Sequence, residues 1–364
     1  MKILNISALL MSLLLISCND SPPLFNDGNS KLTLFAFRDS TGHDGHSNYV
    51  PLKHAKIFLV SEYGTSIRYA DENGKLEAEN LPSSVYQVVV KTAHPDDPNI
   101  MFVGTLTGMD ISPEKSKCDT IIAKPVSSSG ISINEVYYSG PVNNIFYFYD
   151  QFLELYNSSD SIKYLDGMIV GRLLSDDSKG AAPGEDVDND NVIDGIGIGR
   201  LFKFPGKPGE KNFPFLPKSF ILLASDAADH RSSVPGSIDL RNAQWEFFNQ
   251  YSANDIDNPV SANLINMRSE QTADFLLNLI GDVVVITNGC DSTWEDGLDI
   301  STIIDGVEYQ DSSNPKTLSS KVDRGYVSGP PRYSGRSVQR REPGMDSNDG
   351  SIDWEIIPAP TPGY

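Results

Sequence analysis

The sequence predicts a mainly β protein built from two β-sandwich domains, with short helices in inserted segments. Three observations lead to this fold class. Short runs of alternating or β-branched apolar residues recur along the chain, separated by segments rich in Gly, Pro, Asn and Asp. A Ser-rich segment at residues 125–130 divides these runs into two series. The 364 residues suffice for two domains of ordinary size, each with its own core.

The chain begins with the pattern of a bacterial lipoprotein signal. One basic residue, Lys2, precedes an apolar run that closes with Leu15-Ile16-Ser17-Cys18. The run is about half of the roughly 20 residues that a membrane-spanning helix needs. We therefore expect residues 1–17 to be removed as a signal peptide and acyl chains on Cys18 to anchor the protein in the outer membrane, facing the periplasm or the cell surface. An ordinary cleaved signal with an incidental cysteine is the alternative. Residues 18–30, rich in Ser, Pro, Asn and Asp, would form a flexible tether.

Composition limits the partners and the redox chemistry. The chain has 49 acidic and 29 basic residues and a formal net charge of −20. Such a surface repels phosphate backbones, which argues against a nucleic-acid partner. Beyond Cys18, the remaining cysteines are Cys118 and Cys290. They could pair in an oxidising periplasm and join the two halves, or remain two buried free thiols.

The first series of predicted strands begins at residue 31. Residues 31–37 alternate between apolar and polar side chains, and residues 55–60 and 86–90 are rich in β-branched ones. Asn73-Gly74 lies between the last two runs, and this pair tolerates the positive φ of a tight hairpin turn. Strands spaced by such turns indicate a small β-sandwich.

Three segments of this first series resemble the transthyretin-like or carboxypeptidase-regulatory-like modules of surface lipoproteins. They are VPLKHAKI at residues 50–57, ADENGK at 70–75 and NLPSSVYQV at 80–88. The resemblance covers residues 31–125. It implies a spacer or docking surface and no catalysis.

A second series of strands follows the Ser-rich segment, from residue 131. Its apolar runs alternate as the two inner faces of a sandwich require. They are ISINEV at 131–136, FLELYN at 152–157, SFILLA at 219–224, GDVVVI at 281–286, IDGVEY at 304–309 and SVQR at 337–340. Residues 243–251 and 269–279 are the only helix-like stretches and predict a few helical turns.

These runs, with Asp353-Trp354 and the final TPG at residues 361–363, resemble a lamin-tail domain, which is an immunoglobulin-like sandwich. The resemblance spans residues 131–364, and this chain departs from it by insertions near 175–215 and 226–275. The lipidated start, the regulatory-like module and the enlarged lamin-tail-like domain together resemble an uncharacterised Bacteroidetes lipoprotein family of unknown function.

The sharpest local motif is an aspartate-rich loop inside the first insertion. Asp186, Asp188, Asp190 and Asp194 occupy positions one, three, five and nine of a calcium-loop pattern. Asn191 replaces the usual turn glycine, and Gly197 replaces the bidentate acidic residue. The loop is therefore either a Ca²⁺ site that rigidifies the insertion or a solvated acidic turn.

Aromatic and basic residues supply a candidate binding surface. Trp245 and Trp294 would form a platform for sugar rings if they are exposed. Arg332 and Arg336 belong to a basic cluster with Arg340 and Arg341, which either pairs with internal carboxylates or docks an acidic partner or anionic glycan. The aromatic stretch at residues 137–152 suits core packing or a ligand platform.

The sequence predicts a protein without catalytic activity. It contains no Gly-x-Ser-x-Gly elbow, no phosphate-binding Gly-Lys-Thr loop and no His-Glu-x-x-His pair. The predicted role is a binding or assembly accessory of an outer-membrane transporter or surface complex, with the insertions as contact surface. The alternative is a surface adhesin for glycans or matrix. A hydrolase built on the inserted loops is a third reading, and it requires converging carboxylates with raised pKa values in a cleft.

Overall fold

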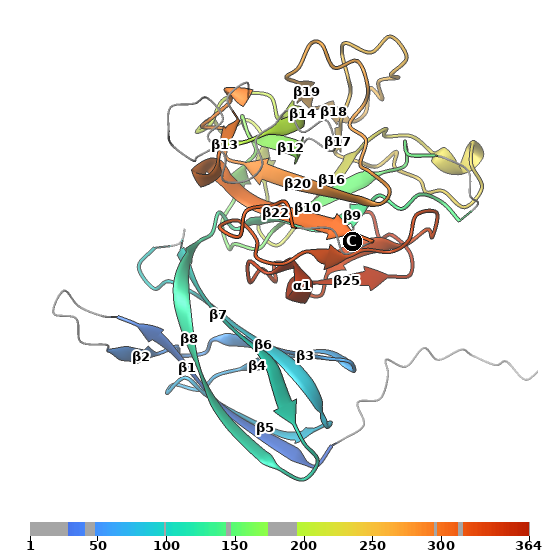
Figure 1. Ribbon diagram of the computed structural model, residues 1–364. Helices are drawn as coiled ribbons and strands as arrows, with labels where there is room; N and C mark the ends of the chain where they lie inside the picture. The colour runs from blue at the N-terminus through green and yellow to red at the C-terminus, as the bar shows by residue number, and fades with distance from the viewer. Residues whose placement is uncertain are drawn as a thin grey trace, which may run out of the picture.

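The computed structural model describes residues 28–40, 48–97, 100–142, 147–173, 195–294, 297–311 and 316–363. Its strands form two bodies stacked end to end (Figure 1). Strands β1–β8 make the N-terminal body, and strands β9–β25 make the C-terminal body. Helical segments in the described ranges are short, namely η1 (His230–Ser232), η3 (Ile300–Thr302) and α1 (Gly350–Asp353). The mainly β prediction is confirmed. Of the described helices, none has both the length and the apolar character to cross a membrane.

The N-terminal body is one hydrogen-bonded sheet in the order β2-β1-β8-β7-β6-β3-β4, with β5 paired to β1. Its strands are β1 (Ser30–Asp39), β2 (Tyr49–Pro51), β3 (Lys56–Ser61), β4 (Gly64–Tyr69), β5 (Lys75–Leu81), β6 (Ser84–Ala93), β7 (Ile100–Ile111) and β8 (Ser116–Ser127). β1 runs parallel to β8, whereas the other pairs are antiparallel.

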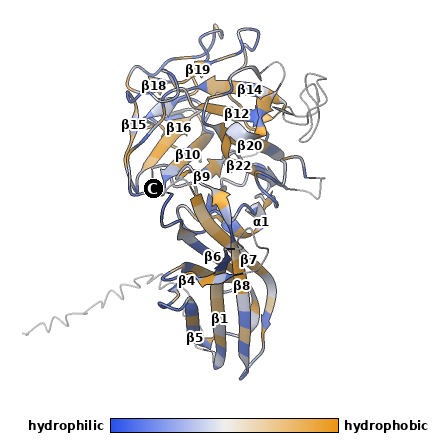
Figure 2. Ribbon diagram, turned by 90° about the vertical axis from the view of Figure 1, so that its left-hand side faces the viewer, coloured by the Kyte–Doolittle hydropathy of each residue, from blue (hydrophilic) through white to orange (hydrophobic). Residues whose placement is uncertain are grey.

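Alternating side chains close this sheet over a single core. Leu32 and Leu34 of β1 are buried in the same cluster as Ile57 of β3 and Val88 of β6. Polar and apolar residues alternate along the strands of this body (Figure 2). The period of two sends one set of side chains inward and the other to solvent, which is the pattern that predicted these strands.

The Asn-Gly turn forms, but it does not join a hairpin. Gly74 has a φ of +72°, and the Asp71 carboxylate accepts hydrogen bonds from the backbone N–H groups of Asn73 and Lys75, each at 2.8 Å. The strands on either side, β4 and β5, pair with β3 and β1 respectively and not with each other. The turn therefore carries the chain from one half of the folded sheet to the other.

Two main sheets form the C-terminal body. One has the order β18-β17-β16-β10-β9-β24-β25, and the other β19-β14-β12-β20-β22-β23. The first comprises β9 (Ile131–Tyr137), β10 (Phe152–Asn157), β16 (Phe220–Ala224), β17 (Trp245–Glu246), β18 (Ala262–Asn263), β24 (Ser337–Arg340) and β25 (Trp354–Ile357). The second comprises β12 (Ile169–Leu173), β14 (Ile198–Lys203), β19 (Ile265–Asn266), β20 (Gly281–Thr287), β22 (Ile303–Gln310) and β23 (Val327–Ser328). Two small ribbons pair β11 (Lys163–Tyr164) with β15 (Pro214–Phe215) and β13 (Gly195–Ile196) with β21 (Leu298–Asp299). The six predicted strands of this half are confirmed as β9, β10, β16, β20, β22 and β24.

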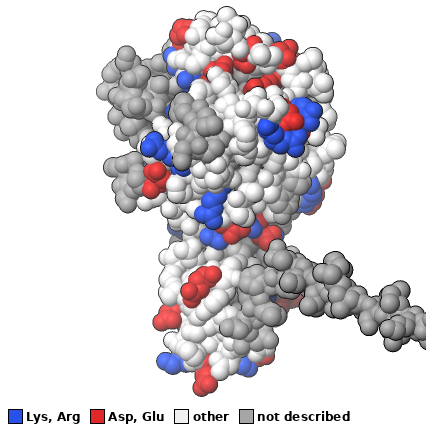
Figure 3. Space-filling model, turned by 90° about the vertical axis from the view of Figure 1, so that its right-hand side faces the viewer, with Lys and Arg blue, Asp and Glu red and all other residues white. Residues whose placement is uncertain are grey.

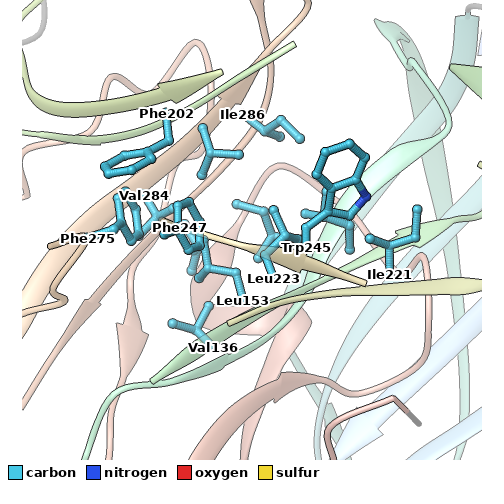
Figure 4. Close-up of a cluster of buried hydrophobic side chains, with 14 of the residues drawn as sticks. Val136, Leu153, Phe202, Ile221, Leu223, Trp245, Phe247, Phe275, Val284 and Ile286 are labelled. Carbon is cyan, nitrogen blue, oxygen red and sulfur yellow. The ribbon is translucent and has the colours of Figure 1, made fainter. Parts of the chain in front are cut away.

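The main core lies between these two sheets. Val136, Leu153 and Leu223 from the first sheet meet Val284 and Ile286 from the second (Figure 4). Aromatic rings fill the space beside them. Phe247 and Phe275 stack with centroids 4.0 Å apart, and Phe202 meets both edge-on. Burial of this much aromatic area is a dominant stabilising contribution.

The two predicted helices in the insertion are wrong. Trp245-Glu246 pairs as a strand with β16, and Trp245 and Phe247 both point into the core. In the second segment Phe275, Leu277 and Leu279 are buried while Leu276 and Asn278 are not. Burial of every second residue is the signature of extended chain. The Gln151 side chain fixes this conformation by bonding both backbone groups of Leu277.

Candidate functional site

An arginine-lined pocket of about 440 Å³ opens on the C-terminal body, and we call it the arginine pocket. Its lining residues are Phe148, Arg172, Arg200, Leu276, Leu277, Asn278, Leu279, Ile280, Arg332 and Tyr333. They come from β12, β14 and three loops. The volume lies in the range of small-ligand sites.

Two of the arginines face each other across adjacent strands. Arg172 of β12 and Arg200 of β14 are direct partners in the antiparallel register. Like charges opposite each other cost stability, roughly 0.2–1 kcal/mol for such a pair. Two guanidinium groups therefore meet in one pocket of a chain whose net charge is −20.

Arg172 is held by the start of β20 and by the segment that precedes this strand. Its Nε forms an ion pair with Asp282, and its Nη1 donates a hydrogen bond to the Leu276 carbonyl at 2.6 Å. The Asp282 carboxylate also accepts from the Asn278 N–H at 3.0 Å. Burial raises the pKa of Asp282, and the charge of Arg172 opposes that shift. The guanidinium of Arg172 is therefore fixed in place.

Among the residues that the structure describes, no carboxylate forms an ion pair with Arg200. Its Nη1 donates to the backbone carbonyls of Ala273 and Asp274, at 2.9 and 2.8 Å. Burial and then the positive charge of Arg172 lower the pKa of Arg200, against the weaker opposing effect of the Asp274 charge. An anion bound beside Arg200 would stabilise the charged form of its guanidinium group.

The apolar and aromatic walls are tied to the central strands. The Gln151 amide bridges the carbonyls of Tyr138 and Leu277, at 3.2 and 2.9 Å. The Tyr333 N–H donates to the Ser139 carbonyl at 2.5 Å. The pocket is thus held by hydrogen bonds on two sides and is preorganised for a ligand.

The predicted binding residues separate into three environments. Arg332 lines the arginine pocket, exposed, with its guanidinium carbon 5.7 Å from the Tyr333 ring centroid. Arg336 is also exposed but does not line it. Trp294 is half-buried beneath the guanidinium of Arg268, at 4.1 Å. Trp245 is only 6% exposed, because Phe204 and Phe213 enclose it, so its prediction as part of an exposed platform is wrong.

Other predicted sites fall outside the described residues or are corrected. Cys18 and the loop with Asp186, Asp188, Asp190 and Asp194 lie outside the described ranges. Within those ranges, no group of three or more His, Cys, Asp or Glu side chains is arranged to hold a metal ion. Cys118 and Cys290 are free and exposed, so neither the disulfide nor the pair of buried thiols is found. In the aromatic stretch, Tyr137, Tyr138 and Phe152 are core residues.

The basic cluster contains one arginine with a structural role. Arg340 is fully enclosed and contacts three carboxylates, Asp305 at 2.9 Å, Asp353 at 3.3 Å and Asp346 at 3.7 Å. It also donates to the carbonyls of Ile133 and Met345. This confirms internal pairing for Arg340, whereas Arg332 and Arg336 point to solvent.

Sequence reasoning missed Arg172 and Arg200, although a signal was present. Each is a single charge inside an apolar strand, in IVGRL at residues 169–173 and IGRLF at 198–202. A buried strand position rarely carries an arginine without a partner or a function. Only the register of β12 on β14 shows that the two meet.

Four acidic side chains, Asp226, Glu246, Asp255 and Asp274, interact with one another and have raised pKa values, as the hydrolase reading requires, but they do not line the arginine pocket. Burial raises the pKa of Glu246 to about 7. Burial and the neighbouring charge of Asp255 raise the pKa of Asp274 to about 6. Burial is also the main cause that raises the pKa of Asp226 in this acidic group.

These raised pKa values predict a pH dependence of stability. The folded protein binds protons more tightly than the unfolded chain, so the stabilisation is complete below about pH 4 and is lost as the pH rises to about 7. We expect a higher melting temperature at pH 5.5 than at pH 7.5. Asp274→Asn should narrow the difference, whereas Asp110→Asn, at an exposed position of the N-terminal body, should not. An equal difference in Asp274→Asn and the parent protein would contradict this assignment.

The chain resembles one known family in sequence and fold. Residues 217–302 match the family described as "Protein of unknown function (DUF4876)". A DUF4876 family protein from Bacteroides thetaiotaomicron is 21% identical, with a TM-score of 0.53, over 89% of this chain and 94% of that one. A protein described as carbohydrate-binding, from Bacteroides uniformis, is 10% identical over 40% of this chain and 61% of that one, with a TM-score of 0.20, too low to support an argument. No curated protein matches the chain. The chain therefore shares its fold with a DUF4876 protein and carries the sequence pattern of that family, whose function is unknown, over residues 217–302.

Proposed function

We propose that this protein is a non-catalytic, lipid-anchored protein of the cell envelope that binds an acidic sugar in the arginine pocket. The observation that carries the proposal is the direct opposition of Arg172 and Arg200 in the strand register. Three guanidinium groups, counting Arg332, border one pocket of a strongly acidic protein. A stable fold has no need of this arrangement, whereas an anion site does.

The chemistry of the pocket favours a carboxylate on a ring-shaped ligand. The planar guanidinium fork matches the two oxygens of a carboxylate. Phe148 and Tyr333 supply aromatic faces, and the leucines at 276, 277 and 279 supply apolar surface. Aromatic faces stack on the apolar faces of pyranose rings. A uronic acid residue at the end of a glycan combines both features.

Arg332 offers the cleanest test, because it is exposed and its removal leaves the strand pairing intact. An array of uronic-acid oligosaccharides and their carboxyl-reduced counterparts first selects the ligand for the purified full-length protein. We expect Arg332→Gln to weaken binding of the selected ligand about tenfold in a calorimetric titration, as expected for a lost charged hydrogen bond.

Arg336→Gln is the matched control, since Arg336 is an exposed arginine four residues away and outside the pocket. It should change the affinity less than twofold. Equal affinity of the parent protein and Arg332→Gln, or equal binding of acidic and carboxyl-reduced sugars, would refute the proposal.

A role as accessory of a membrane transporter or surface complex is the second candidate function. It is favoured by apolar side chains exposed on the inserted loop near residues 251–265. Ile256 is 78% exposed and Val260 is 85% exposed. On the face seen in Figure 3, acidic and basic side chains lie in small separate groups among uncharged surface.

The partner hypothesis predicts that Ile256→Ser/Val260→Ser loses a stoichiometric membrane-protein partner from detergent-solubilised membranes. The double variant Val85→Ser/Val142→Ser, which replaces two other exposed valines, should retain it. If the parent protein is recovered alone, the accessory role is wrong. A calcium chelator in a parallel sample tests whether the loop with Asp186, Asp188, Asp190 and Asp194 supports the contact.

The remaining assignments complete the proposal. Lipidation of Cys18 would place both bodies at the outer membrane. The strands of the two bodies support a transthyretin-like or regulatory-like module at residues 31–125 and a lamin-tail-like sandwich at 131–364. Nucleic acid is not proposed as a partner, because of the net charge.

A further inference from the structure

A second cavity of about 660 Å³ lies where the two bodies meet, and we call it the lysine cleft. Strands β3, β6 and β7 of the N-terminal body form one wall. The loop from Tyr156 to Lys163, together with Lys218, Pro343 and Gly344, forms the wall from the C-terminal body. Ser128 and Gly130 connect the two walls. None of these residues lines the arginine pocket.

The two bodies are in contact beneath the cleft, so its shape is preformed. Phe58, Val60 and Val89 of the N-terminal body share a buried cluster with Met345 and Ile352 of the C-terminal body. The Lys91 ammonium donates a hydrogen bond to the Gly344 carbonyl at 2.8 Å. Arg324 donates to the Thr105 hydroxyl at 3.2 Å. A cleft between surfaces joined in this way does not need to be assembled by its ligand.

Four lysines from both bodies face a single carboxylate in this cleft. Asp160 pairs with Lys218 at 3.1 Å. The Lys91 ammonium already donates a hydrogen bond to the Gly344 carbonyl. The Lys56 ammonium lies over the Phe58 ring, 4.8 Å from its centroid. Among the described residues, neither Lys56 nor Lys163 forms an ion pair. Two ammonium groups on opposite walls are thus available to an anion.

Neutral groups beside the lysines suit a sugar chain. Ser158, Ser159 and Ser161 line the same wall as Tyr156, whose ring packs against Phe220 with centroids 4.6 Å apart. Gly344 lies directly against Ser158 and the Tyr156 ring, because a Cβ on it would come within 2.6 Å of the serine Cβ. The wall therefore combines hydroxyl groups with a supported aromatic ring.

We propose that the lysine cleft is a second binding site, for a glycan segment that carries sulfate groups. Ammonium groups act as point charges and suit tetrahedral oxyanions, whereas the guanidinium forks of the arginine pocket suit planar carboxylates. Lys56 and Lys163 would contact sulfate groups from the two bodies, and Tyr156 would support a sugar ring. The site is independent of the arginine pocket, so either proposal can fail without the other.

The test is titration of the full-length protein with a sulfated hexasaccharide, its desulfated counterpart and vesicles containing anionic phospholipid. We expect the sulfated hexasaccharide alone to bind, and the double variant Lys56→Gln/Lys163→Gln to bind it about tenfold more weakly. The double variant Lys117→Gln/Lys124→Gln removes the same charge from exposed positions of β8 outside the cleft. It should bind as the parent protein does, and so should Arg332→Gln.

Four outcomes would overturn the proposal. The first three are unchanged affinity in Lys56→Gln/Lys163→Gln, an equal loss in Lys117→Gln/Lys124→Gln, and binding to vesicles without binding to the hexasaccharide. A loss confined to Arg332→Gln would also overturn it while leaving the arginine pocket as an anion site. Melting temperatures of all variants, measured in parallel, separate loss of binding from loss of folding.

Discussion

Arg340→Met is expected to lower the free energy of unfolding by about 3–5 kcal/mol. The guanidinium of Arg340 contacts Asp305 through two hydrogen bonds, at 2.9 and 3.0 Å, and also contacts Asp353 and Asp346. Methionine fills similar volume but leaves these buried carboxylates without a cation. Burial already raises the pKa of Asp353 to about 7, although the charge of Arg340 opposes the shift. The free-energy cost of burying the charged carboxylate would therefore be larger without the arginine. Chemical denaturation at neutral pH measures the difference.

Arg341→Met is the matched control for this experiment. Arg341 is the next residue along the chain, and it pairs with Glu355 at 3.1 Å where both side chains reach solvent. Exposed ion pairs of this kind contribute about 0–1 kcal/mol. If Arg340→Met lost no more stability than Arg341→Met, the buried network would not hold the C-terminal body together.

Trp245→Ala is the second substitution with a large expected effect, about 3–5 kcal/mol of unfolding free energy. The indole is enclosed by Phe204 and Phe213, with centroids 4.8 and 5.2 Å away. Truncation would leave a cavity that the paired strands β16 and β17 cannot close. The loss should appear in thermal and denaturant unfolding, and the arginine pocket should keep its ligand affinity under native conditions.

Trp294→Ala serves as the comparison, because Trp294 is half-buried and packs chiefly under Arg268. We expect a loss of about 1–2 kcal/mol there. A stability loss at Trp245 as small as that at Trp294 would mean that the indole is not a core residue. A drop in ligand affinity without a drop in stability would mean that Trp245 belongs to a binding surface, as the sequence predicted.

The strands were predictable because their signal is local. Residues 152–157 and 337–340 are strands with those same bounds, since alternation and β-branching act within a few residues. The turn at Asn73-Gly74 was predictable for the same reason. The strand pairs beside this turn were not predictable, because β5 pairs with residues of β1 that lie forty or more positions away.

The helix predictions were wrong because tertiary contacts outweigh the local spacing of apolar residues. The spacing of Ala273, Leu276 and Leu277 fits a helix, but hydrogen bonds with Gln151, 126 residues earlier, hold Leu277 in extended chain.

The candidate site was predictable from the sequence only in part, for a similar reason. Arg332 belongs to a visible cluster of arginines, whereas Arg172 and Arg200 become a pair only through strand register. Trp245 looked accessible because an insertion was assumed to lie on the surface, yet this one contributes a strand to the main sheet.

Both proposed sites place positive charge on an acidic molecule in a defined geometry. In the arginine pocket the charge is carried by planar guanidinium groups, beside aromatic and apolar walls. In the lysine cleft the charge is spread over two bodies and lies beside hydroxyl groups. The two cavities share no lining residue, so the two proposed sites can be tested separately.

A crystal structure of the protein with the uronic-acid oligosaccharide selected by the array is the most direct test of sugar binding in the arginine pocket. We expect a carboxylate within hydrogen-bonding distance of Arg200 or Arg332, with a sugar ring against Phe148 or Tyr333. An oligosaccharide bound elsewhere while the arginine pocket is empty would show that this pocket is not the sugar site.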